Sequence, residues 1–260
     1  MEKLPLSVLL LARDEEARMG ALLPTLAFAR DLVVVVDAAT RDRTREVAAQ
    51  AGARVCERML DDFGLQRRFA LECCREEWVL WLDADERLDP AAERAVREAI
   101  ARPGGAAAFR LARLTWFLGG RIRHCGWGGE RVVRLFRRSV ARFDPAAVHE
   151  RVAITGPVSD LPGAIEHRSY ESWSDCREKL VRYAAAGAEQ ARRRGRSAGP
   201  LDVVLRPPLR FVRMYLIQAG FLDGSRGLAV CLMGAAQVLL KYMDLWLGAR
   251  GTPQPPGRGR

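Results

Sequence analysis

The sequence predicts an α/β fold: a mostly parallel sheet with helices on both faces, followed by a C-terminal helical region. Short apolar runs recur along the first hundred residues, polar segments with helical periodicity separate them, and from Ser172 onward the pattern is helical. Strands that are apolar on both faces and alternate with helices are typical of a parallel sheet covered on both sides.

The N-terminal elements follow in order along the chain. The apolar runs expected as buried strands are residues 6–11, 32–36, 53–56 and 78–82. The helices expected between them are residues 15–30, 42–51 and 65–75. Asp42 is the expected N-cap of the second helix. Asp89 and Pro90 mark the start of a further helix, which ends before Pro103 and two glycines.

The second half continues with strands and then turns helical. Further strands are expected at residues 107–114, 131–136 and 148–154, with glycines as punctuation. Residues 175–194 are expected to form one long helix that ends in arginines followed by Gly195. After Arg206-Pro207-Pro208, helical patterns cover residues 209–222 and 227–240.

The last of these segments raises the question of a membrane. Its 14 uncharged residues are fewer than the roughly 17–25 that a spanning helix needs, which disfavours a transmembrane helix. Packing against the first domain and docking in a bilayer interface as a basic amphipathic element remain the alternatives. Residues 249–260, rich in Gly and Pro, are expected to be a disordered tail.

The composition excludes several classes of protein. A chain of 260 residues with 49% hydrophobic and 28% charged residues is not disordered, collagen-like or a small disulfide scaffold. The six cysteines include no C-x-x-C pair, which argues against a zinc cluster. The N-terminus shows no signal-peptide layout, so we expect reduced thiols in a cytoplasm.

The net charge of +10 is unevenly distributed. Residues 1–100 carry a net charge of −5 and residues 101–260 carry +15. The basic second part could meet a polyanion or an anionic membrane surface. A bias toward arginine, which makes up 39 of the 42 basic residues, is the alternative explanation.

Carboxylates stand directly after two of the expected strands. One strand runs into Asp37, and another runs into Asp83-Ala84-Asp85-Glu86. Ligands of such sheets bind at the carboxyl ends of the strands, and crowded carboxylates are tolerated most easily around a cation. Oxygen ligands at this place suit Mg²⁺ or Mn²⁺ that also binds a diphosphate. The sequence has no Gly-rich phosphate loop, so metal and arginine would meet the phosphate charge.

The ordered motifs resemble glycosyltransferase family 2, which has the GT-A fold, and within it the branch of lipopolysaccharide core β-glucosyltransferases. The resemblance covers roughly residues 5–245 and rests on several pieces. They are Asp14-Glu15-Glu16, Asp37 with Thr40-Arg41-Asp42-Arg43-Thr44, Gln66-Arg67-Arg68-Phe69-Ala70, Asp83-Ala84-Asp85, Arg134-Leu135-Phe136-Arg137, Val148-His149-Glu150 and Phe221-Leu222-Asp223-Gly224. The family's usual N-E-E begins here with Asp14, and Ala38 replaces a usual serine.

The resemblance implies a role for each matched position. The residues implied in donor binding are Asp14, Glu15, Asp37, Gln66, Arg67 or Arg68, and Asp83. Asp83 and Asp85 form the D-x-D pair that binds Mg²⁺ or Mn²⁺, with His167 as a further ligand unless it is structural. Trp116, Trp127 and Arg134 are expected on the acceptor side, and a buried core position is the alternative for each Trp.

Inverting sugar transfer also needs a base that takes the proton of the acceptor hydroxyl. Glu150 is the first candidate, because partial burial and neighbouring carboxylates raise the pKa of a carboxyl group. His149 is the competing candidate, since its ordinary pKa lies near the working pH. A structural hydrogen-bonded pair of the two is the alternative interpretation.

These expectations combine into one function. The predicted protein is an inverting hexosyltransferase that uses a nucleotide-diphospho-sugar, a UDP-sugar in the first instance, and a lipid-linked or lipopolysaccharide-core glycan acceptor. The expected domains are a GT-A core at 1–168, a helical region at 169–248 and the tail, with a cytoplasmic location at the membrane's inner face. The alternatives are a nucleotidyltransferase and a non-catalytic Arg-rich protein that binds membrane or nucleic acid.

Overall fold

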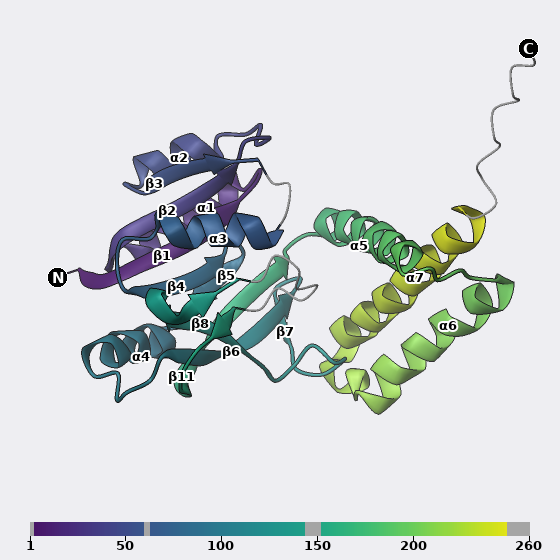
Figure 1. Ribbon diagram of the computed structural model, residues 1–260. Coiled ribbons are helices and arrows are strands. Elements are labelled where there is room, and N and C mark those ends of the chain that lie inside the picture. Colours follow the sequence, from purple (N-terminus) through teal and green to yellow (C-terminus); the bar gives the residue numbers. More distant parts are fainter. Residues whose placement is uncertain (1–2, 60–62, 144–151, 249–260) are drawn as a thin grey trace, which may run out of the picture. The chain divides into compact units, whose positions relative to one another are not determined.

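A computed structural model describes residues 3–59, 63–143 and 152–248 (Figure 1). The chain forms two compact units. Unit 1 comprises Met1–Leu114 with Gly129–His167, and unit 2 comprises Thr115–Gly128 with Arg168–Arg260. The expected assignment of residues 1–168 and 169–248 to separate functional domains stays a prediction.

Four parallel strands of unit 1 are adjacent in the order β3-β2-β1-β4 (Figure 1). They are β1 (Leu4–Ala12), β2 (Ala29–Asp37), β3 (Arg54–Arg58) and β4 (Trp78–Asp83). Successive side chains of β1 belong to two different apolar clusters, Val8 and Leu10 to one and Leu9 to the other. Both faces of the sheet are therefore covered, because neighbouring residues of a strand point to opposite faces.

Antiparallel strands extend this sheet beyond β4. They are β8 (Glu130–Arg137), β6 (Ala108–Phe117), β11 (Val158–Tyr170) and β5 (Glu86–Leu88), and β7 (Gly120–Ile122) pairs with β6. The short strands β9 (Ala141–Arg142) and β10 (Ala153–Ile154) pair separately, after the 3₁₀ turn η2 (Arg138–Val140). The expected fold class, a helix-covered α/β sheet followed by a helical region, is confirmed.

The helices of unit 1 follow the sequence signals with local differences. They are α1 (Glu16–Leu22), the 3₁₀ helix η1 (Leu23–Leu26), α2 (Thr44–Gln50), α3 (Phe63–Cys73) and α4 (Pro90–Ala101). The expected first helix, residues 15–30, is too long, because Pro24 lacks an N–H and β2 already begins at Ala29. Asp89 caps α4 as predicted, accepting from the Ala92 N–H at 2.6 Å. The N-cap of α2 is Arg43, one residue after the predicted Asp42.

Unit 2 contains α5 (Trp173–Arg193), α6 (Pro200–Val212), the π-helical turn η3 (Arg213–Ile217), the 3₁₀ turn η4 (Gly220–Asp223) and α7 (Gly224–Gly248). Helix α7 packs against both α5 and α6 (Figure 1). The expectation that Pro207 and Pro208 precede a helix is wrong, since both lie inside α6. Pro207 is buried there, so packing outweighs the cost of two missing N–H donors.

One described helix meets the length and composition expected of a membrane span. It is Gly220–Gly248, with a mean hydropathy of 1.5, and 22% of its most apolar window is buried. The apolar helix is therefore longer than the uncharged run of residues 227–240 from which the sequence disfavours a transmembrane helix. Such a helix is weak evidence by itself, because core helices have the same length and composition. The predicted tail at 249–260 lies outside the described residues.

Candidate active site

The carboxyl ends of β1, β2 and β4 bring the strand-end carboxylates to one edge of the sheet. In the registers of β1, Leu11 pairs with Val35 of β2 on one side and with Asp83 of β4 on the other. Asp37, the last residue of β2, therefore ends at the same edge as Asp83. One strand separates the two carboxylates, so a ligand of nucleotide size can contact both.

Asp37 is almost completely buried at this edge. Its Oδ1 accepts a hydrogen bond from the Ala39 N–H at 3.0 Å, and Arg13 Nη1 lies 3.1 Å from its Oδ2. Thr40 follows in the same loop, and its buried hydroxyl has no hydrogen-bond partner among the described residues. A carboxylate held by its own loop suits recognition of ligand hydroxyl or N–H groups.

The two loops that follow β1 and β2 are joined by hydrogen bonds. Asp14 Oδ1 accepts from the Arg41 N–H at 2.7 Å, and the Thr44 hydroxyl accepts from the Glu15 N–H at 2.9 Å. Asp42 Oδ2 accepts from the Glu16 N–H at 2.9 Å. The acidic and hydroxyl residues of both motifs therefore shape the loops, and the donor-binding roles of Asp14 and Glu15 stay predictions.

Three predicted donor-binding residues lie on helix α3 and differ in their exposure to solvent. Gln66 and Arg67 are buried, and Gln66 Oε1 has no hydrogen-bond partner among the described residues. The Arg67 guanidinium lies 5.2 Å from the centroid of the Trp81 ring. Arg68 is exposed and pairs with Glu72 at 3.2 Å. The geometry favours Arg67 over Arg68 for contact with a ligand.

A network of charged side chains surrounds the end of β4. Arg134 Nη2 donates to Asp83 Oδ2 at 2.8 Å and to Glu86 Oε1 at 2.7 Å. The Asp83 N–H donates to Glu86 Oε2 at 3.1 Å, and Arg113 Nε lies 3.1 Å from Glu86 Oε1. The Arg134 guanidinium also lies 4.7 Å from the Trp81 ring centroid. Asp83 is thus held by Arg134, which is held in turn by Glu86.

Glu86 is the most buried carboxylate of this network. Burial raises the pKa of Glu86 and the negative charge of Asp83 adds to this effect, while the guanidinium groups of Arg134 and Arg113 act in the opposite direction. Arg134 and Arg113 therefore neutralise much of the negative charge of the crowded carboxylates. That crowding was the reason to expect a cation at this place.

Asp85 and His167 form a second group beside this network. His167 lies opposite Glu86 in the pairing of β11 with β5, and its Nε2 is 3.4 Å from Asp85 Oδ2. His167 Nε2 also lies 2.8 Å from Arg113 Nη2. Since a guanidinium only donates, Nε2 is the acceptor in that contact.

These donors offer a limited fit to a divalent cation. Among the described residues there is no group of three or more His, Cys, Asp or Glu side chains arranged to hold a metal. Mg²⁺ keeps several waters and binds substrate phosphates, so it needs few protein ligands. Asp85 and His167 lie close enough to offer two ligands, but His167 Nε2 accepts from Arg113 and Asp83 Oδ2 is bonded to Arg134.

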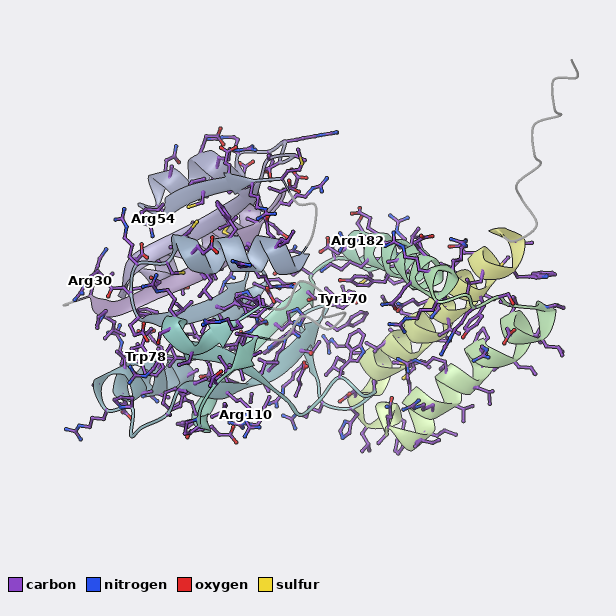
Figure 2. The ribbon with its side chains drawn as sticks, viewed as in Figure 1. Arg30, Arg54, Trp78, Arg110, Tyr170 and Arg182 are labelled. Atoms are coloured by element: carbon purple, nitrogen blue, oxygen red, sulfur yellow. The ribbon has the colours of Figure 1, made fainter. Side chains whose placement is uncertain are left out.

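The predicted acceptor-side residues fall in both units. Trp127 in unit 2 stacks on Tyr170, with ring centroids 5.4 Å apart and an interplanar angle of 16° (Tyr170 is labelled in Figure 2). The Trp116 ring centroid lies 5.7 Å from the Arg168 guanidinium. Arg134 in unit 1 is buried in the network around Asp83. The stacking of Trp127 fits a role in packing, and the acceptor-side role of all three stays a prediction.

In the motif Phe221-Leu222-Asp223-Gly224, the contacts of Asp223 have a structural role. The Asp223 carboxylate accepts from the backbone N–H groups of Arg123 and His124, and the His124 Nδ1 lies 3.0 Å from its Oδ1. Burial alone would raise the pKa of Asp223, but the hydrogen bonds from His124 and Arg123 outweigh it and lower the pKa. Asp223 thereby anchors the glycine-rich loop of unit 2.

Some site residues were missed from the sequence, and others cannot be placed. Sequence reasoning missed Glu86 and Arg113 as partners of the D-x-D segment, and Arg13 as the partner of Asp37. The arginines of β6 and β8 recur at a spacing of three residues, which does not match the two-residue period of a strand, so no local signal marked the inward-facing guanidinium groups. The base candidates His149 and Glu150 lie outside the described residues.

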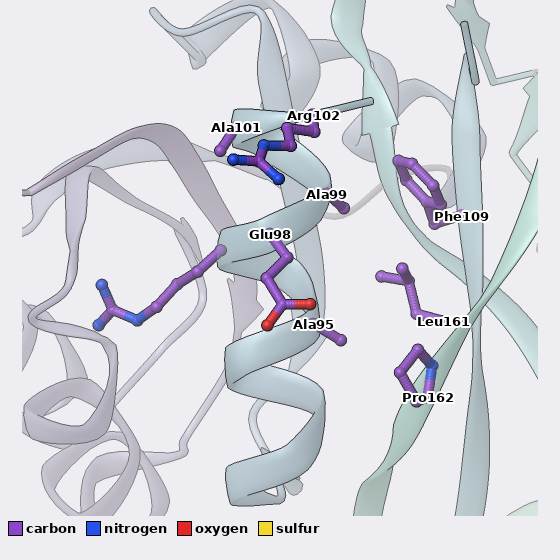
Figure 3. A pocket seen from close by; sticks show the side chains of 9 residues that line it. Ala95, Glu98, Ala99, Ala101, Arg102, Phe109, Leu161 and Pro162 are labelled. Atoms are coloured by element: carbon purple, nitrogen blue, oxygen red, sulfur yellow. The ribbon is translucent and has the colours of Figure 1, made fainter. Parts of the chain in front are cut away.

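A separate pocket in unit 1 contains none of the predicted site residues. It lies between the C-terminal half of α4 and strands β6 and β11, where Ala95, Glu98, Phe109 and Leu161 line it (Figure 3). Its lining mixes apolar side chains with Arg97, Glu98 and Arg102 and includes no strand-end carboxylate, so nothing assigns it to the chemistry.

Comparisons with known proteins agree with the motif pattern. Residues 7–117 match the family model described as glycosyl transferase family 2. The lipopolysaccharide core biosynthesis glycosyltransferase LpsC of Rhizobium meliloti (strain 1021) is 26% identical over 253 residues, which cover 92% of this chain and 94% of that protein. An uncharacterised glycosyltransferase of Rickettsia typhi is 22% identical over 92% of this chain and 86% of that protein.

A solved structure shows a more distant likeness. The mannosyltransferase PcManGT from Pyrobaculum calidifontis, in complex with GDP-Man and Mn²⁺, is 14% identical with a TM-score of 0.48. The match covers 94% of this chain and 87% of that one. A likeness at this level carries no argument about function.

Proposed function

We propose that this chain, whose residues 7–117 match the family 2 glycosyltransferase model, transfers a hexose from a nucleotide-diphospho-sugar to a glycan acceptor with inversion. The donor is a UDP-sugar in this proposal. The acceptor is a lipid-linked or lipopolysaccharide-core glycan, in keeping with the name of the LpsC relative.

The observation that carries the proposal is the common edge at which β2 and β4 end. Asp37 and Asp83 stand there on either side of β1, and buried Gln66 and Arg67 come from α3. This arrangement provides carboxylates for nucleoside hydroxyl groups and a guanidinium for a diphosphate. We assign donor binding to these four residues.

The chemical step is a single displacement at the anomeric carbon. A lone pair of the acceptor hydroxyl oxygen forms the new glycosidic bond while the bond from that carbon to the diphosphate oxygen breaks, and its electron pair leaves with the nucleoside diphosphate. The acceptor proton passes to the carboxylate of Glu150 in this proposal, with His149 as the alternative base. The Glu86–Arg134 pair holds Asp83 in place during the step.

A divalent cation, Mg²⁺ or Mn²⁺, belongs to the proposal. Asp85 and His167 are the residues proposed to hold it. When bound, such a cation neutralises charge that develops on the departing diphosphate.

The proposed location follows from the proposed acceptor. An enzyme that acts on a lipid-linked glycan works where that lipid is, so we place the protein in the cytoplasm, peripherally on the inner face of the membrane. In this proposal residues 1–168 bind the donor, and the helical residues 169–248 contact the membrane. The acceptor-side roles of Trp116, Trp127 and Arg134 belong to this proposal, and packing on Tyr170 is the competing role of Trp127.

Transfer from labelled UDP-hexoses to a bacterial envelope lipid extract tests the proposal. The wild-type chain should release UDP and move label to the lipid fraction. Glu150→Gln should bind UDP normally but transfer at least about 100-fold more slowly, because the base is lost while donor contacts remain. His149→Gln is the matched control. Normal transfer by Glu150→Gln and loss in His149→Gln would assign the base to His149, and no transfer from any UDP-hexose would contradict the proposed donor.

A further inference from the structure

Helix α6 turns its apolar side chains outward. Its residues at helical spacing, Leu201, Val204, Leu205, Leu209 and Val212, are all between 43% and 72% exposed. Residues three and four positions apart share one face of a helix, so these side chains form a continuous stripe, here called the apolar face of α6. A helix of a globular protein ordinarily buries such a stripe.

The apolar exposure continues beyond α6. Leu216 and Ile217 in η3, and Phe221 and Leu222 in η4, are also exposed. Pro207 lies on the buried side of α6, and Met214 is the buried residue of η3. Bulky apolar side chains exposed together in this number mark an interaction surface rather than scattered surface residues.

Positive charge accompanies the apolar face of α6. Residues 192–213 contain seven arginines and one aspartate. Arg206 and Arg213 are exposed on the helix and its extension, and Arg206 is held by Asp202 at 2.6 Å. Basic residues flanking an apolar helical stripe are typical of helices that lie in the interface of an anionic bilayer.

The charges also distinguish a bilayer from a second copy of the chain. A two-fold interface through this face would bring the same arginines of both copies close together. Like charges at an interface oppose association, whereas lipid phosphates complement them.

Packing argues for a helix lying in the interface rather than a spanning one. The apolar segment Gly220–Gly248 consists of η4 and α7, and α7 packs on α5. The Arg192 guanidinium of α5 donates to the Asp244 carbonyl of α7 at 2.7 Å. Exposed charges of α5, Arg182 among them (Figure 2), would enter the hydrocarbon with a spanning α7, at high cost.

We infer that the chain docks on an anionic bilayer leaflet through the apolar face of α6, with the helix parallel to the membrane plane. Leucine and valine side chains enter the boundary between headgroups and acyl chains, and neighbouring arginines meet lipid phosphates. The inference rests on the proposed function, because it supplies the surface through which a transferase could reach a lipid-linked acceptor.

Flotation of the full-length chain with vesicles tests this inference. The vesicles contain phosphatidylcholine alone or phosphatidylcholine with phosphatidylglycerol. Wild-type protein should float with the anionic vesicles and be released by high salt and by alkaline carbonate. Leu205→Glu/Leu209→Glu should weaken vesicle binding at least about 100-fold, since two inserted leucines become charged. The control Val181→Glu changes an equally exposed apolar residue of α5 and should bind as wild type.

The outcomes that overturn the inference are separate from those that overturn the proposed function. Unchanged binding by both Leu205→Glu/Leu209→Glu and a second variant, Leu201→Glu, would remove α6 from the docking surface. Resistance to carbonate would show a spanning segment instead. A dimer that the double variant abolishes, without vesicle binding by the wild type, would assign the face to a second copy. Titration with UDP on the same preparations reports the donor site independently.

Discussion

Removing Arg134 should destabilise unit 1, because this side chain holds two carboxylates at the end of β4. Its side chain is 6% exposed and its Nη2 lies 2.7 Å from Glu86, which is fully buried, and 2.8 Å from Asp83, which is 40% exposed. Loss of one member of a buried ion pair costs about 3–5 kcal/mol. Asp83 can regain water and Glu86 keeps Arg113 at 3.1 Å, so we expect Arg134→Met to cost about 3 kcal/mol, the lower end of that range.

Urea denaturation of four proteins measures this value and its origin. They are the wild type, Arg134→Met, Glu86→Gln and the double variant. If Glu86 is the partner that matters, Arg134→Met costs less in the Glu86→Gln background, and the coupling free energy is at least about 1 kcal/mol. A loss below about 1 kcal/mol for Arg134→Met, or coupling near zero, would show that Arg134 does not stabilise the buried Glu86.

Two further predictions concern stability away from the site. Burial alone would raise the pKa of Asp31, but hydrogen bonds from Arg54 (labelled in Figure 2), Ser7 and a backbone N–H outweigh it and lower the pKa. The Asp31 carboxylate therefore stabilises the fold at pH values above its unfolded pKa of about 3.9, and this stabilisation is lost as the pH falls through the lower folded pKa. Asp31→Asn should cost about 2–3 kcal/mol at pH 7 and progressively less in acid. A difference in unfolding free energy that does not change with pH in urea titrations would contradict this. Gly227→Ala would place a Cβ atom 2.0 Å from the Gly220 carbonyl oxygen and should cost unit 2 at least about 2 kcal/mol in the same assay. Gly20→Ala in α1, whose Cβ would meet only Val47 Cγ1 at 3.9 Å, should not destabilise the protein, because alanine favours a helix over glycine. Equal losses in the two variants would exclude the steric explanation.

Local signals explain which parts of the fold the sequence could predict. The parallel strands follow from runs such as Val33–Val36 that are apolar on both faces, and Asp37 and Asp83 could be placed because each directly ends such a run. Helix α4 was predictable because Asp89 and Pro90 are adjacent start signals. These features depend on neighbours in sequence, so no tertiary information was needed.

The partners of the site residues depend on tertiary packing and could not be predicted in the same way. Arg134 meets Glu86 across 48 residues of chain, through the pairing of β8 with β4. Periodicity in α6 predicts an apolar face but cannot say whether that face points inward, and here it is exposed. Local propensity disfavours Pro207 and Pro208 inside a helix and therefore predicts a helix boundary there, but both lie inside α6, where packing overrides that preference.

The proposed function depends on a metal-assisted nucleotide site at the strand-end carboxylates. The decisive measurement is calorimetric titration with UDP, GDP, CDP and dTDP, each with Mn²⁺ and with chelator. We expect UDP to bind in the presence of Mn²⁺, chelator to abolish most of this binding, and Asp85→Asn to lower the affinity at least about 10-fold. Absence of binding by all four nucleotides, or equal UDP affinity in Asp85→Asn and wild type, would contradict the proposed nucleotide site.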